Sequence, residues 1–220
     1  MSVGRRRRGE EGAAAVEAAL VTGVIVLLIF GIMELTFLVR DYVAVTSAAR
    51  VGARIASTGA DDGPCITEPD DLVPCPSGSV PELAQHAADA ISESIDSLPE
   101  DSVTHVMVYK ANDKGFPGAF TSMPSVTQCV TQCVVYTWSP AKNRFRYSRG
   151  SWVSSQIQAC VPSRKSASGA AGILDTVGVQ VVVRHKLLTG MFGSALTLSD
   201  HSVMKFEPLN NDYCEAGYHQ

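Results

Sequence analysis

The chain has 220 residues, with 18 basic and 22 acidic side chains and a formal net charge of −4. The charge is uneven, because residues 1–12 hold four arginines and two glutamates and sum to +2, which leaves −6 for the rest. An acidic body argues against nucleic acid as a main partner, and the length allows one domain with or without a membrane segment.

The first element in chain order is an apolar helix long enough to cross a membrane. Residues 18–33 carry no charge, and a helix over residues 13–39 would rise about 40 Å, against about 30 Å for a hydrocarbon core. Four arginines precede this run, and the positive-inside rule keeps such a cluster in the cytoplasm. We therefore expect a cytoplasmic leader, a span at about residues 18–39 and a body outside the membrane. A cleaved secretory signal is the alternative, which the length of the run and the acids around it disfavour.

Two acids, Glu17 and Glu34, border the uncharged run. They would lie about 25 Å apart along a helix, near opposite edges of the hydrocarbon core, where a carboxylate costs less than at the centre. If a peptidase cut after Gly12, Ala13 would become the N-terminus, and its α-amine could pair with Glu17 of a neighbouring copy. Glu34 is expected as a second intramembrane acid on a different face of the helix.

The helix is expected to continue beyond the membrane to residue 58, just before the turn signal GADDGP. A face of small and apolar residues, at positions 44, 48, 52 and 55, would pack against a sheet. The predicted divisions are therefore a leader at 1–12, a long helix at 13–58 and an extracytoplasmic domain at 59–220.

The domain is predicted to be α+β with an antiparallel sheet. Residues 59–79 are typical of a loop, and residues 81–98 carry an apolar stripe at helical period. Strands are predicted at 103–110, 132–138, 176–185 and 195–207, with the third half-buried and the last two antiparallel neighbours.

Two segments of the domain remain open to interpretation. The apolar link at 185–196 either touches the membrane surface or a partner, or packs internally. The basic segment 139–171 is expected to be a solvated loop with a short helix near 152–160, and a surface for an acidic polymer is the alternative.

Six cysteines follow the apolar run, an even number that suits disulfides in an oxidising compartment. Six cysteines allow 15 pairings, of which a bridge across the loop between Cys65 and Cys75 is favoured. They lack the ligand spacing of a zinc site, and no metal or cofactor is expected. The candidate disulfide cysteines are Cys65, Cys75, Cys129, Cys133, Cys160 and Cys214.

Signals for an enzyme are poor, so no catalytic residue is proposed. The five histidines are dispersed, and Ser139 and Lys142 form an S-x-x-K match without its companion motifs.

Four stretches resemble the TadE-like family, the minor pseudopilins of tight-adherence (Flp-type) pilus systems. They read GAAAVEAALV, LLIFGIMEL, VTSAARVGARIAS and, near the far end, VGVQVVVRHKLLTGMFGSALTLSDHSVMKFE. The N-terminal resemblance covers residues 12–57 and the weaker C-terminal one 176–207, whereas residues 60–175 show no family motif. Ala18 departs from the family, which usually has an aromatic residue there.

The resemblance implies a pilin-like fold and a role in assembling a surface filament for adhesion. Gly12 would precede the cut, Ala13 would be the new end and Glu17 the assembly carboxylate. Its partners would be membrane lipid, a prepilin peptidase, other pilins or pseudopilins and an inner-membrane assembly platform, with no nucleic acid. The alternative is a single-pass membrane-anchored extracytoplasmic binding or sensing domain that is not processed.

Overall fold

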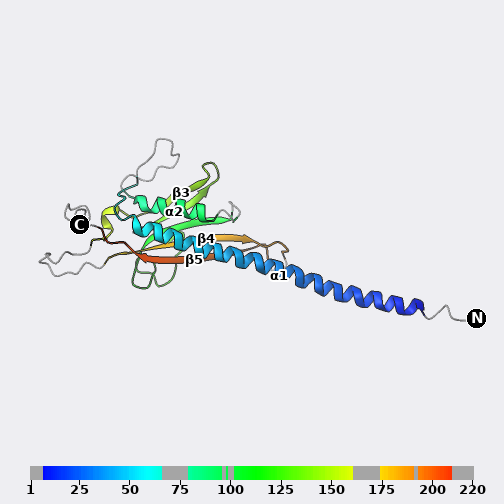
Figure 1. Cartoon of the computed structure of the whole chain (residues 1–220). Coiled ribbons are helices and arrows are strands. Elements are labelled where there is room, and N and C mark those ends of the chain that lie inside the picture. The colour runs from blue at the N-terminus through cyan, green and yellow to red at the C-terminus, as the bar shows by residue number, and fades with distance from the viewer. Residues whose placement is uncertain are drawn as a thin grey trace, which may run out of the picture.

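A computed structural model describes residues 7–65, 79–95, 98, 102–160, 174–190 and 193–209, with side chains from Gly12 onward. It consists of a long helix, a short helix and one antiparallel sheet (Figure 1). The predicted α+β class is confirmed.

Helix α1 runs from Arg7 to Thr58. It therefore begins before residue 13, where the sequence placed its start, and it ends at the predicted residue. No proline interrupts its 52 residues, and Gly63, with φ at 80°, lies in the turn that follows. The N-terminal half projects as a lone helix, and the C-terminal half lies on the sheet (Figure 1).

Helix α2 spans Glu82–Ser94 and packs beside α1 on the same face of the sheet. It is shorter than the predicted 81–98, because Ile95 forms its C-cap. The predicted apolar stripe faces inward, and its buried residues are Leu83, Ala84, Ala87, Ala88 and Ile91.

Five strands form the sheet in the order β3-β2-β1-β4-β5, and every neighbouring pair is antiparallel. Their bounds are β1 Val103–Ala111, β2 Cys133–Ser139, β3 Arg144–Ser151, β4 Thr176–Lys186 and β5 Ala195–Lys205. The four predicted strands are confirmed. Two 3-10 turns, η1 Val126–Gln128 and η2 Ser154–Gln156, lie in the connections.

Strand β3 corrects the prediction of a solvated loop at 139–171. Phe145 is fully buried against the helices, and Tyr147 is partly buried against the same core. The arginines between the aromatic residues masked this alternation, because charge dominated the interpretation of the segment. The helix expected near 152–160 is reduced to the single turn η2.

Strand β4 is buried on both faces rather than half-buried as predicted. Val179 and Val181 face the helices, and Gln180 and Val182 on the other face are only 7% exposed. Gly178 lies so close to the ring of Tyr109 on β1 that an added Cβ would approach it to 2.3 Å. Packing from both sides explains the valine-rich sequence.

The main core lies between the two helices and the sheet. Gly52 is a point of close approach, because a Cβ there would lie 2.6 Å from Ile91 Cδ1 on α2 and 3.1 Å from Val179 Cγ1 on β4. Of the predicted packing face, Ala48 is fully buried, but Ile55 is 38% exposed. The helix is rotated so that Ala56 takes the inward position instead.

A smaller core covers the opposite face of β1 and β2. It contains Met107, Tyr109 and Val135 together with the disulfide between Cys129 and Cys133. Cys65 and Cys160 are also disulfide-bonded. The favoured Cys65–Cys75 bridge stays a prediction, because Cys75 and Cys214 lie outside the described residues.

Candidate functional site

The projecting half of α1 is the most unusual surface of the molecule. Every residue from Gly12 to Phe30 is exposed, and no part of the most apolar window is buried inside the structure. This stretch is roughly 28 Å long at 1.5 Å per residue, close to the hydrocarbon thickness of about 30 Å. A soluble protein rarely exposes such an apolar surface, so the helix fits a single-pass membrane anchor.

The predicted processing residues lie at the outer end of this segment. Gly12 is exposed, and a Cβ added to it would meet nothing within 4 Å. Glu17 is exposed on the same helix, and the described part of the chain supplies it with no hydrogen bond or ion pair. Gly12, Ala13 and Glu17 are therefore accessible in a single copy, and their roles stay predictions.

Glu34 is placed differently from Glu17. Its side chain is only 5% exposed, because it packs against the loop between β4 and β5. The carboxylate accepts hydrogen bonds from Leu188 N at 2.8 Å, from Thr189 N at 3.1 Å and from Thr189 Oγ1 at 3.0 Å. Two backbone N–H groups of a loop are thus satisfied by one helix side chain.

A second polar contact joins α1 to the sheet two turns further along. Asp41 Oδ2 lies 2.7 Å from His185 Nδ1 near the end of β4. His185 is 6% and Asp41 8% exposed, so the pair is shielded from water. Together the two contacts fix the position of α1 relative to the sheet at the point where the helix projects from the domain.

Sequence reasoning found Glu34 but missed its partners and missed the pair of Asp41 with His185. Glu34 lies 154 positions before Leu188, and Asp41 lies 144 before His185. One signal in the sequence could have indicated this pair. Asp41 follows the apolar run of the helix and His185 ends a predicted strand, and that helix and the sheet were expected to pack together. The sequence does not give the relative position of those segments along the helix.

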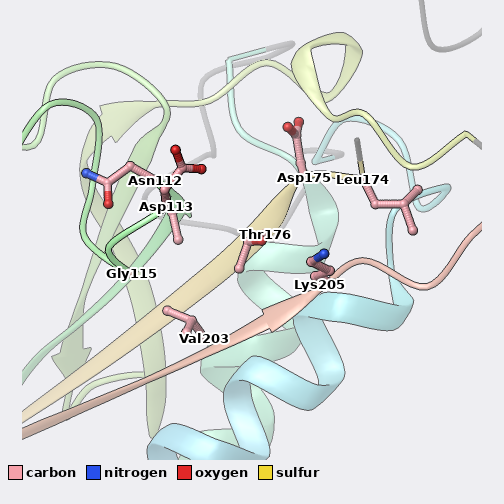
Figure 2. A pocket seen from close by; sticks show the side chains of 9 residues that line it. Asn112, Asp113, Gly115, Leu174, Asp175, Thr176, Val203 and Lys205 are labelled. Atoms are coloured by element: carbon pink, nitrogen blue, oxygen red, sulfur yellow. The ribbon is translucent and has the colours of Figure 1, made fainter. Parts of the chain in front are cut away.

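A polar cavity of about 480 Å³ lies at the end of the sheet remote from the projecting helix, and Figure 2 shows its lining. Asp175 belongs to its wall, but Lys110 Nζ at 2.6 Å and Gln158 N at 2.8 Å already bind that carboxylate. The wall comprises Ala111, Asn112, Asp113, Gly115, Leu174, Asp175, Thr176, Val203 and Lys205.

The groups with shifted pKa values do not gather at this cavity. Burial raises the pKa of Asp89 on α2 despite the opposing charge of Arg144, and burial lowers the pKa of His105 on β1. Burial also raises the pKa values of Tyr109 and Tyr136. None of these four groups lines the cavity. Asp89 lies near enough to Tyr136 that its charge also raises the pKa of that phenol, and it is bound by Arg144.

The S-x-x-K match forms a turn. Lys142 N donates to Ser139 O at 3.1 Å in the connection between β2 and β3, where Asn143 adopts φ of 49°. No group of three metal-ligating side chains occurs in the ranges that the structure describes.

Comparison with known proteins gives one positive finding. Residues 12–54 match the family model described as TadE-like protein, so the match is confined to α1. Neither the curated proteins nor the solved structures gave a match. The resemblance expected near the N-terminus is confirmed, and the chain carries a TadE-like segment over residues 12–54. The weaker resemblance expected at residues 176–207 lies outside this match and stays a prediction.

Proposed function

We propose that this protein is a minor pseudopilin that helps to assemble a surface filament for adhesion. A prepilin peptidase cuts between Gly12 and Ala13, the leader stays in the cytoplasm, and the domain lies outside the membrane. The processed copies then pack side by side through α1, together with other pilins or pseudopilins and an inner-membrane platform.

Glu17 carries this proposal, because it is exposed and has no partner among the residues that the structure describes. A carboxylate at the edge of a lipid-facing helix is costly alone, and the α-amine of a processed neighbour would compensate its charge. The face of α1 that points away from the sheet is also exposed beyond Glu34, since Val43, Arg50 and Arg54 on this face are exposed. One continuous face of the helix is thereby available to neighbouring copies.

The experiment that tests processing is the intact mass of the membrane-bound protein, isolated with its native peptidase present. A chain that begins at Ala13, with or without an added methyl group, is the expected result. A chain that still begins near Met1 would contradict the proposal. It would leave the alternative, a membrane-anchored domain that binds or senses a ligand without being processed.

The assembly role predicts the effect of Glu17→Ala. The variant should insert into the membrane as the wild type does, but its incorporation into filaments or pilin complexes should fall by about tenfold or more, because tenfold corresponds to an ion pair of about 1.4 kcal/mol. Co-purification with the other pilins measures this.

Glu93→Ala is the matched control, because Glu93 is also an exposed glutamate on a helix but belongs to the domain. Equal incorporation of both variants would remove the role assigned to Glu17.

A further inference from the structure

The loop between β4 and β5 reaches toward the membrane-spanning part of α1. His185 contacts α1 at Asp41, and three to four residues later Leu188 and Thr189 contact it at Glu34. The seven residues from Glu34 to Asp41 correspond to a rise of roughly 10 Å along α1. The loop after His185 therefore extends by that distance along α1 toward its N-terminal, apolar half. Figure 1 shows β4 running toward the projecting half of α1.

Leu188 and Thr189 are the described loop residues that lie beside the apolar segment of α1. Leu188 and Thr189 line a small cavity of about 330 Å³ together with Phe30, Met33 and Glu34. Phe30 and Met33 are exposed members of the apolar run, and Leu188 is 70% exposed. An apolar surface therefore passes without interruption from the helix to the loop.

Two backbone N–H groups of this loop are satisfied within the protein, those of Leu188 and Thr189. Unpaired backbone N–H groups are costly in a bilayer, and Glu34 accepts from those of Leu188 and Thr189. The same contacts shield the carboxylate, which is 5% exposed.

Basic side chains lie on the domain side of this apolar surface. Arg184 and Lys186 flank His185 and are exposed, and Arg40 is exposed beside Asp41 on α1. Arg40 lies roughly 9 Å beyond Glu34, the depth at which lipid phosphates are found when Glu34 marks the edge of the hydrocarbon core. Such residues anchor spans at the interface.

We propose that Leu188 and Thr189, in the described first part of the β4–β5 loop, form a second membrane contact. Leu188 lies in the lipid interface of the leaflet on the domain side, and Glu34 holds this part of the loop against α1. The occupant of the cavity is lipid acyl chain rather than another protein. The inference rests on the membrane anchor but requires neither cleavage at Gly12 nor filament assembly.

The test is a depth measurement on the full, uncleaved chain in liposomes. An environment-sensitive fluorophore is attached at Leu188→Cys, and its quenching is compared among phospholipids carrying nitroxides at shallow and deep acyl positions. The control is Val203→Cys, because Val203 is an exposed aliphatic residue, 40% exposed, near the far end of β5. We expect several-fold stronger quenching at 188 than at 203, with the shallow nitroxide more effective.

Adding Glu34→Ala to the labelled chain tests the role of the carboxylate. Without the acceptor, the loop should leave the helix, and quenching at 188 should fall toward the level at 203. Unchanged quenching would overturn the holding role assigned to Glu34.

Three further results would contradict the membrane contact. A label at 188 that emits as in water shows a loop outside the interface. A label that is shielded from water but not quenched shows a protein contact instead of lipid. A chain that does not float with the liposomes overturns the membrane anchor itself, and this inference with it.

Discussion

At the scale of single residues, two aspartate–histidine contacts in this protein differ mainly in burial. Asp41 and His185 are 2.7 Å apart, with side chains 12% and 6% exposed. Asp62 and His86 are 3.1 Å apart, with side chains 29% and 50% exposed. Removing one partner of a buried pair leaves the other without its hydrogen bond, whereas water replaces a partner lost at the surface.

Asp41→Ala should therefore lower the free energy of unfolding by about 1–3 kcal/mol, because it strands His185 in the interface between α1 and β4. Asp62→Ala should cost less than about 1 kcal/mol. Denaturant unfolding of the full chain in detergent measures both. Equal losses for the two variants would show that burial does not set the strength of these contacts.

At the scale of elements, the two halves of α1 differ in how much space surrounds their glycines. Gly52 lies between α2 and β4, where an added Cβ would approach Ile91 Cδ1 to 2.6 Å. Gly23 lies in the projecting half, where an added Cβ meets nothing within 4 Å. The same residue type is thus required by packing in one half, and in the other half is left open to lipid or to a neighbouring helix.

Gly52→Val should destabilise the domain by about 1–3 kcal/mol, since the extra volume forces α1 away from α2 and the sheet. Gly23→Val is the matched control, with the same substitution in the same helix, and should leave the unfolding of the domain unchanged. Thermal unfolding in detergent compares them. A Gly52 variant as stable as the wild type would show that the interface has room that the structure does not reveal.

At the scale of the whole molecule, the long helix is an anchor and also part of the domain. Its second half supplies fully buried residues to the core, namely Val45, Ala48, Ala49, Ala53 and Ala56. The domain division predicted at residue 59 therefore separates segments that pack as one unit. From Gly12 to Phe30 the helix contributes no buried side chain.

Truncation should separate these two roles. A chain that begins at residue 34 should remain soluble and unfold cooperatively, because it keeps the whole core and loses the exposed apolar segment. A chain that begins at residue 60 should fail to fold, because the sheet loses the helix that covers β4 and β5. Gel filtration and thermal unfolding distinguish them, and a cooperative transition in the shorter chain would refute this account.

The sequence by itself determined the elements of this protein and the membrane character of α1. The apolar run located the long helix, helical periodicity located α2, and alternation located β4, because each of these patterns is a local property of the sequence. The strands at β1, β2 and β5 were also predicted from local sequence. The uncharged run and the motif around Gly12 and Glu17 are equally local, and they led to the TadE-like resemblance that the family model matches at residues 12–54.

Only the tertiary structure decided what the polar residues of the junction do. Glu34 looked like a second membrane acid, and its three hydrogen bonds come from a loop 154 and 155 positions away. His185 was one of five dispersed histidines until β4 brought it to Asp41. Strand β3 was hidden because its arginines suggested solvent, whereas pairing with β2 buries Phe145 under α2. Such contacts depend on where distant elements meet along α1, and local periodicity contains no information about that distance.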